Sequence, residues 1–353
     1  MRPLHSAYCI ILFLILTACT AQNKSSTTEI NNPDHNHSIS EEPQIAEYIR
    51  TIHEDKNGNL WFGTNGLGVA HYNGDSVSYY SLEQGFHGYQ ITGITEDEDQ
   101  KLWFATDQGV VSYDWTSDKT GNKIFSNYSE KKYFEGKRFW SIYADSKGKV
   151  WAGSVDKIYS YDGHSWKHFE LPYPEIDTGT FLSKSTTWSI TEDSKSNMWF
   201  STNGYGAFKF DGEKFTNIST QNGLIDDSVD AILEDSKENI WLGTRFGGVS
   251  RYDGDTIKNF VVEGFTTYEV CCVYEDSSEN IWFSAEGYGI YRYDGETLKN
   301  FNHKHGLGIR APQTIFEDSH GRLWVGGGGG LFRFDGLFFT NVTRNGPWPE
   351  TKK

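Results

Sequence analysis

The chain has 353 residues, of which 48 are Asp or Glu and 32 are Lys or Arg, so its net charge is −16 at pH 7. This excess of acid repels phosphate and argues against nucleic acid as a partner. Four cysteines in a chain of this length exclude a fold held together by disulfides.

The first residues are typical of an export signal. Arg2 precedes an apolar run over residues 10–16 that is too short to span a membrane as a helix. The next residues, Leu-Thr-Ala-Cys ending at Cys19, resemble the bacterial lipobox, which implies cleavage before Cys19 and lipidation of its thiol. A plain signal peptide or a short core segment is the alternative. We expect 1–18 to be a lipoprotein signal peptide, and the mature chain to be anchored by lipid alone on the periplasmic or cell-surface side of a membrane.

The residues that follow divide the chain into three further parts. Residues 19–42 are mainly Ser, Thr, Asn, Pro, His and Glu, with too few apolar side chains to form a core. We therefore predict a disordered tether over 19–42, one folded body over 43–345 and a C-terminal tail over 346–353.

The folded part repeats one motif seven times. An aspartate stands six residues before a tryptophan in each copy, and a triplet related to Tyr-Asp-Gly follows. The tryptophans recur every 41 to 48 residues, as Trp61, Trp103, Trp151, Trp199, Trp241, Trp282 and Trp324. Landmarks that keep their register over seven copies identify a repeat protein.

Each copy contains four short strand patterns separated by turn residues. In the fifth copy they cover 230–233, 240–244, 248–252 and 256–260. The turns are rich in Asp, Asn, Ser and Gly, and apolar residues do not recur at helical spacing. We predict an all-β fold: one seven-bladed β-propeller with four antiparallel strands in each blade.

The copies resemble the two-component regulator propeller repeat. The family consensus, Ile-x-Glu-Asp-x-x-Gly-x-Leu-Trp followed by Gly and Tyr-Asp-Gly, is matched closely at 52–64, 232–244 and 315–327. The resemblance implies kinship with periplasmic sensor propellers of hybrid histidine kinases, which often recognise oligosaccharides. The sequence has fewer copies than those receptors often have, and no kinase follows, so we do not expect the signalling role to carry over.

One position in the repeat does not keep its residue type. Three residues before each turn aspartate stands a branched apolar residue such as Ile52 or Ile232, which we assign to the blade core. The fifth residue before it varies strongly, as expected where a site rather than the fold sets the choice. These residues should ring one mouth of the channel: Arg50, Thr92, Trp140, Trp188, Asp230, Cys271 and Gln313.

Turns between the second and third strands should reach the same mouth. They contribute Asn65, Asp107, Asp156, Tyr205, Arg245, Phe246, Glu286 and Tyr288. From both groups we predict that the ligand-binding residues are Arg50, Trp140, Trp188, Asp230, Gln313, Tyr205, Arg245 and Tyr288. Aromatic faces beside polar groups suit a small polar molecule or a glycan, with a protein partner as a further possibility. The alternative for Trp140 and Trp188 is packing between blades.

Two copies carry insertions. Residues 171–187 fall on the predicted mouth, where they could form a lid, while residues 115–123 fall on the opposite face. A tolerated insertion is the competing interpretation.

Catalytic and metal motifs are weak. The sequence has no nucleophile elbow, phosphate loop or zinc motif, and His303 and His305 lack a further ligand at metal-binding spacing. We expect no cofactor, no metal and a binding module rather than an enzyme. The alternative is a lyase, because the seven-bladed streptogramin lyases look similar in architecture; that resemblance would make His87 or His305 the base.

Overall fold

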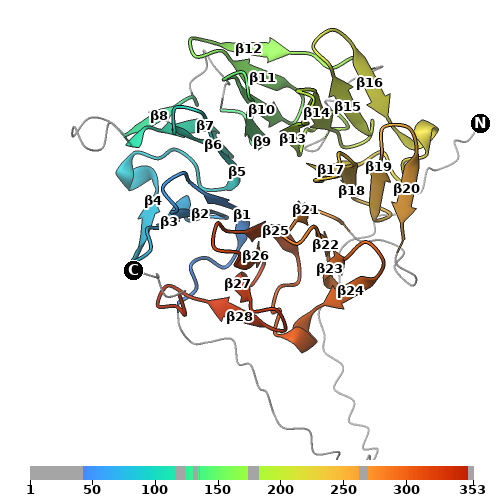
Figure 1. Cartoon of the computed structure of the whole chain (residues 1–353). Coiled ribbons are helices and arrows are strands. Elements are labelled where there is room, and N and C mark those ends of the chain that lie inside the picture. The colour runs from blue at the N-terminus through green and yellow to red at the C-terminus, as the bar shows by residue number, and fades with distance from the viewer. Residues whose placement is uncertain are drawn as a thin grey trace, which may run out of the picture. The chain divides into compact units, whose positions relative to one another are not determined.

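Seven four-stranded antiparallel sheets are arranged around a central channel (Figure 1). The computed structural model describes residues 43–115, 124–129, 134, 136–173, 183–261 and 269–348. The predicted all-β, seven-bladed propeller is therefore confirmed. The predicted signal peptide 1–18, Cys19 and the tether 19–42 lie outside the described residues.

Every blade runs outward from an inner strand that borders the channel. The first blade consists of β1 (Ile49–Glu54), β2 (Leu60–Thr64), β3 (Val69–Tyr72) and β4 (Val77–Tyr80), and the second of β5 (Ile91–Glu96), β6 (Leu102–Thr106), β7 (Gly109–Tyr113) and β8 (Phe125–Asn127). The third blade consists of β9 (Phe139–Ala144), β10 (Val150–Ser154), β11 (Ile158–Tyr161) and β12 (Trp166–Phe169), and the fourth of β13 (Ile190–Glu192), β14 (Met198–Ser201), β15 (Ala207–Phe210) and β16 (Phe215–Ile218).

The remaining three blades follow the same order. They consist of β17 (Val229–Glu234), β18 (Ile240–Thr244), β19 (Val249–Tyr252) and β20 (Ile257–Phe260); β21 (Val273–Glu275), β22 (Ile281–Ala285), β23 (Gly289–Tyr293) and β24 (Leu298–Phe301); β25 (Pro312–Glu317), β26 (Leu323–Gly327), β27 (Gly330–Phe334) and β28 (Phe339–Val342). Three short 3₁₀ turns, η1 (Leu82–Gln84), η2 (Thr220–Asn222) and η3 (His303–His305), follow outer strands.

The repeated aspartate and tryptophan form one structural unit. In the fifth blade, Asp235 Oδ1 accepts hydrogen bonds from the backbone N–H of Lys237 and Asn239, at 2.9 and 2.8 Å, and so closes the turn between β17 and β18. Its second oxygen accepts the Trp241 indole N–H at 2.7 Å. All seven copies make this indole bond, at 2.6–2.8 Å. The six-residue spacing thus fixes both the turn and the indole.

These indoles form the core between blades. Trp241 is 1% exposed and packs against Ile281 and Phe283 of the next blade. The other six tryptophans are equally buried, at 0–4% exposure. Burial of large apolar areas between neighbouring sheets therefore supplies much of the stability.

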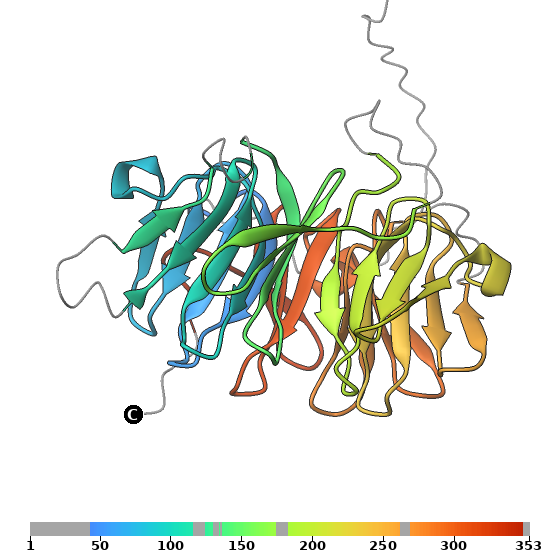
Figure 2. The same cartoon turned by 90° about the horizontal axis from the view of Figure 1, so that it is seen from above.

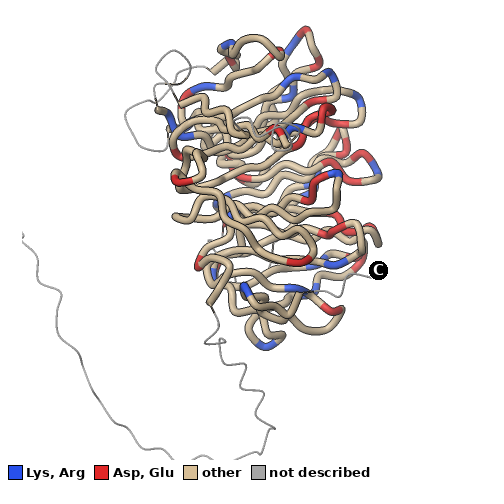
Figure 3. Tube along the Cα trace, turned by 90° about the vertical axis from the view of Figure 1, so that its left-hand side faces the viewer, with Lys and Arg blue, Asp and Glu red and all other residues tan. Residues whose placement is uncertain are grey.

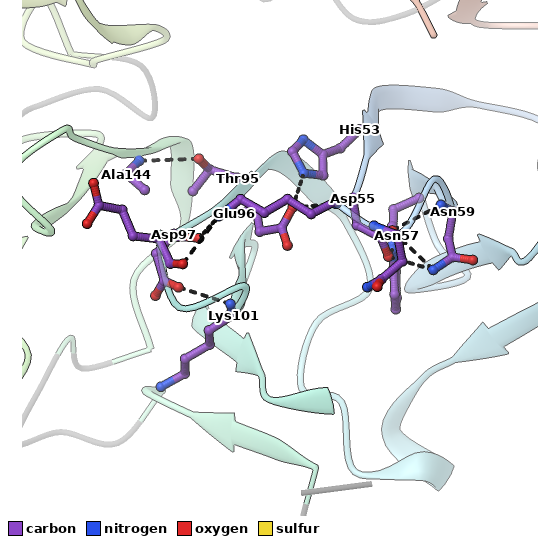
Figure 4. A network of polar contacts seen from close by, with 12 residues as sticks. His53, Asp55, Asn57, Asn59, Thr95, Glu96, Asp97, Lys101 and Ala144 are labelled. Atoms are coloured by element: carbon purple, nitrogen blue, oxygen red, sulfur yellow. Dashed lines mark hydrogen bonds and ion pairs between the residues drawn. The ribbon is translucent and has the colours of Figure 1, made fainter. Parts of the chain in front are cut away.

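The glutamate before the turn aspartate fastens neighbouring blades. Glu234 accepts hydrogen bonds from the Ser194 backbone N–H and hydroxyl, at 2.6 and 2.9 Å. Six junctions carry this bond, with the acceptors Glu96, Glu192, Glu234, Glu275, Glu317 and Glu54. Between the second and third blades Ala144 replaces the glutamate, and its N–H donates instead to Thr95 Oγ1 at 3.2 Å (Figure 4).

The N-terminal residues of the folded part help to close the ring. Gln44 pairs with Thr343, and Tyr48 pairs with Gly328 in the glycine-rich turn after β26. A Cβ at Gly328 would lie 3.2 Å from the Tyr48 ring, and one at Gly327 would lie 2.4 Å from the Ala311 carbonyl oxygen. The glycines are therefore needed because backbone and side chains approach closely there.

Residues of the predicted C-terminal tail also contact the propeller. Trp348 stacks on Tyr72 with ring centroids 3.9 Å apart, and residues 349–353 lie outside the described part.

The two faces of the propeller differ in charge. The strands run between the faces (Figure 2), with the aspartate turns and the Tyr-Asp-Gly turns at one of them. Charged residues gather along one side of the molecule (Figure 3). Within the described ranges, no helix has the length and apolar character needed to cross a bilayer.

Candidate ligand site at the channel mouth

A cavity of about 90 Å³ opens where the inner strands begin. All seven residues of the varied repeat position line it, together with one further side chain. The lining consists of Arg50, Thr92, Trp140, Trp188, Asp230, Glu269, Cys271 and Gln313.

A β-bulge explains why the varied position faces the channel. In β17, Val229 pairs with Thr244 and Ala231 pairs with Gly243, which leaves Asp230 as the extra residue. The same irregularity isolates the equivalent residue of β1, β5, β9 and β25. A bulge re-aims its extra side chain, so the fold repeats the backbone device while the residue type remains free to change.

Two indoles form one wall of the cavity. The ring centroids of Trp140 and Trp188 are 4.5 Å apart at an interplanar angle of 48°. The Arg138 guanidinium lies 5.1 Å from the Trp140 ring centre, and that of Arg245 lies 4.9 Å from Trp188. Cation–π contacts therefore hold the indoles from both sides and fix their orientation.

Acidic residues of the fifth and sixth blades gather around Arg245. Its guanidinium donates to the two oxygens of Asp230 at 3.2 and 3.0 Å, and its Nη2 lies 3.1 Å from Glu269 Oε1. Burial raises the pKa of Asp230 to about 8, against the opposing effect of Arg245 and with a smaller upward contribution from Glu269. Burial and Glu269 also raise the pKa of Glu286. This side of the cavity can hold protons at neutral pH.

Arg50 occupies a different environment. Its guanidinium lies 5.1 Å from the Tyr48 ring centre, and its Nε is buried without a hydrogen-bond partner among the described residues. Burial lowers the pKa of Arg50, because desolvation disfavours its charge. Nearby, Gln313 Nε2 donates to Cys271 Sγ at 3.2 Å. Burial raises the pKa of the Cys271 thiol, which keeps it neutral.

Five of the eight predicted residues line the cavity: Arg50, Trp140, Trp188, Asp230 and Gln313. Arg245 lies behind them, in contact with Asp230 and Trp188. Tyr288 is 40% exposed and is not in the lining, while Tyr205 packs against Tyr173 at 5.2 Å, toward the outer strands.

Glu269 is the lining residue that the repeat pattern misses. It lies two residues before Cys271 in the connection that precedes β21, at a position that was not included in the predicted mouth. Most of the predicted lid, residues 174–182, lies outside the described residues, as do 116–123 of the second insertion.

The histidines considered for catalysis lie elsewhere. Neither His87 nor His305 lines the cavity. Among the described residues, no cluster of His, Cys, Asp and Glu has the geometry of a metal site.

Sequence comparison identifies the repeat. The family model for the two-component regulator propeller matches residues 43–66 and 223–246. Each match contains a turn aspartate and its tryptophan. The chain carries two-component regulator propeller repeats. No curated protein sequence matches the chain.

Solved structures share its fold at low sequence identity. The extracellular domain of BT3049 of B. thetaiotaomicron, assigned to a hybrid two-component system, is 19% identical with a TM-score of 0.65, over 84% of this chain and 40% of that one. For the extracellular domain of BT4673 the values are 18%, 0.66, 82% and 39%. The chain thus spans about two fifths of these relatives' length.

A lyase shares the fold over nearly its whole length. A catalytically inactive histidine-to-alanine variant of virginiamycin B lyase from Staphylococcus aureus, crystallised with quinupristin, is 15% identical with a TM-score of 0.65. The match covers 81% of this chain and 94% of the lyase. Identities this low show a common fold and leave the chemistry to the site.

Proposed function

We propose that the chain is an extracytoplasmic sensor-type propeller that binds a small polar ligand, such as a sugar unit of an oligosaccharide, at its channel mouth. One observation carries the proposal. The residue five before the turn aspartate varies strongly among the copies, and all seven residues at that position line one cavity. If the position served packing alone, the fold would favour small residues there, as it does at the neighbouring position with Thr51, Ser141 and Ala231.

The chemistry of the lining suits such a ligand. The exposed parts of the Trp140–Trp188 pair offer a stacking surface for the C–H face of a sugar ring. Asp230, Glu269 and Gln313 supply acceptors and a donor for hydroxyl groups at the cavity edge. A site that orients polar groups against an aromatic wall discriminates ligands through groups left unpaired in the wrong one.

Export and anchoring complete the proposal. The lipobox-like residues before Cys19 support attachment through lipid, with 19–42 as the spacer. The fold shared with extracellular sensor domains supports a position outside the cytoplasm. The lyase alternative rests on the fold alone, since the described cavity lining contains no histidine.

The test is a glycan and metabolite screen by thermal shift on the whole chain, followed by calorimetry of each hit. Trp188→Ala should weaken binding about tenfold or more, since it removes half of the stacking surface. Phe338→Ala is the matched control, because Phe338 is 51% exposed in a turn between β27 and β28 on the opposite face. Equal affinities for Trp188→Ala and the unmodified chain would place the ligand elsewhere.

A further inference from the structure

Arg50 and Trp188 of the cavity lining each carry a buried donor atom that has no hydrogen-bond partner among the described residues. These are Arg50 Nε and Trp188 Nε1, and both side chains belong to the lining. A buried polar group without a partner costs about 1–3 kcal/mol, and native structures leave few of them. Both groups are donors, so whatever satisfies them must supply acceptor atoms.

The other arginines at the mouth already have acceptors. Arg245 is engaged by Asp230 and Glu269, and Arg138 donates to Gln90 Oε1 at 2.5 Å. Among the described residues that line the cavity, Arg50 is the only cation, and no described carboxylate lies within ion-pair distance of it. Its charge is therefore not compensated by a direct partner, which is costly for a partly buried guanidinium.

Two neutral donors of the lining are occupied. The Thr92 hydroxyl donates to the Phe139 carbonyl oxygen at 2.8 Å, and the Gln313 amide donates to Cys271. Arg50 therefore marks the part of the cavity that favours a ligand acceptor with negative charge.

We propose that the ligand carries an oxyanion, such as a carboxylate or a sulfate ester, bound by the Arg50 guanidinium. This inference rests on the proposed binding function and specifies its ligand class. A guanidinium presents paired N–H groups that match the geometry of an oxyanion, and such charge-assisted bonds are about twice as strong as neutral ones. The planar or ring portion of the ligand then lies against the Trp140–Trp188 pair.

Asp230 and Glu269 determine how the far end of the bound ligand is oriented. Asp230 and Glu269 belong to the fifth and sixth blades, and β17 lies across the channel from β1, which carries Arg50 (Figure 1). An anion is attracted to Arg50, because this side chain carries the positive charge of the lining. Hydroxyl groups at the far end of the ligand meet Asp230 and Glu269 as acceptors.

Probes of similar shape, one neutral and one carrying an oxyanion, test the proposal. Calorimetry on the whole chain would compare D-glucose with D-glucuronate and with D-glucose 6-sulfate, and benzyl alcohol with benzoate. The charged member should bind about tenfold more tightly or better than its neutral analogue. The preference between glucuronate and the sulfate identifies which oxyanion the site takes.

Two variants separate charge at the site from charge in general. Arg50→Gln keeps hydrogen-bonding capacity without the charge and should abolish the preference for charged probes. Arg310→Gln, which removes an exposed arginine outside the lining, should retain it. Circular dichroism and unfolding midpoints confirm that both variants fold.

The outcomes are distinct. Neutral and charged probes binding equally well, or a preference that survives Arg50→Gln, would overturn the oxyanion inference and leave the proposed ligand site standing. Failure of both the sugar set and the aromatic pair to bind at millimolar concentration would contradict this inference together with the proposed function.

Discussion

Truncation of two tryptophans in adjacent blades should have different effects. Trp241→Ala should mainly lower stability, and Trp188→Ala should mainly weaken ligand binding. Trp241 is 1% exposed, packs on the sixth blade and donates to Asp235 at 2.7 Å. Trp241→Ala should lower the free energy of unfolding by about 3–5 kcal/mol through the cavity it leaves. Loss of the indole bond to the turn aspartate adds about 1 kcal/mol.

Trp188 is half-buried and holds a different set of contacts. Truncation removes its aromatic contact with Trp140, worth about 0.5–1.5 kcal/mol, and its cation–π contact with Arg245, worth about 0.5–1 kcal/mol. Removal of an indole N–H that lacks a partner returns part of this cost. Trp188→Ala should therefore destabilise the chain by about 1–2 kcal/mol, well below Trp241→Ala.

Guanidinium unfolding followed by far-ultraviolet circular dichroism measures the difference directly. Binding of a hit from the screen, expressed per folded molecule, gives the second quantity. Trp241→Ala should retain binding where it folds, and Trp188→Ala should lose it. If Trp188→Ala unfolds as readily as Trp241→Ala and still binds normally when folded, its indole serves packing, and the assignment of the mouth as a site is wrong.

Four further predictions concern the blades, the turns, the acidic group and the anchor. Glu234→Ala removes two hydrogen bonds from Ser194 and should cost about 1–2 kcal/mol in chemical denaturation, whereas Glu98→Ala, at the junction without this bond, should cost less than about 0.5 kcal/mol; equal costs would refute the role of the glutamate. Backbone N–H donors of the Tyr-Asp-Gly turns lower the pKa of Asp253 and of Asp294 to about 2, so their contribution to stability is complete above the unfolded pKa of about 4 and is lost as the pH falls through 2; carboxyl NMR titrations with midpoints near 4 would contradict this. Burial raises the pKa of Asp230 to about 8, so the folded chain keeps a proton that the unfolded chain loses near pH 4; stability should fall between pH 4 and 8, and Asp230→Asn, but not the exposed Asp255→Asn, should flatten that slope in unfolding experiments. Cys19→Ala should release the chain from membranes into the soluble fraction after cell fractionation, and persistence in the membrane fraction would show that the anchor lies elsewhere.

The repeat made the fold predictable because each landmark performs a local task in every copy. The turn aspartate closes one turn and holds one indole within six residues, so sequence spacing alone reports the contact. The same regularity separated Ile232, in the blade core, from Asp230, two residues away in the channel. Side chains that serve the fold keep their residue type from copy to copy, whereas the side chains that line the cavity do not.

Contacts between distant segments were not predictable in this way. Glu269 lines the cavity from the connection that precedes β21, and Tyr205 packs against Tyr173 of the connection after β12. The glycine-rich turn after β26 serves ring closure, which depends on Tyr48, nearly the whole chain away. Such pairings form because the ring closes on itself, and no local sequence pattern predicts them.

The structure of the chain with a bound ligand, determined by crystallography with a hit from the screen, tests the central claim most directly. We predict ligand density in the channel mouth, against Trp188, with its oxyanion at Arg50. A second cavity, lined by His168, Leu171 and Tyr173, should stay empty. Ligand density in that cavity, with the channel mouth empty, would contradict the account.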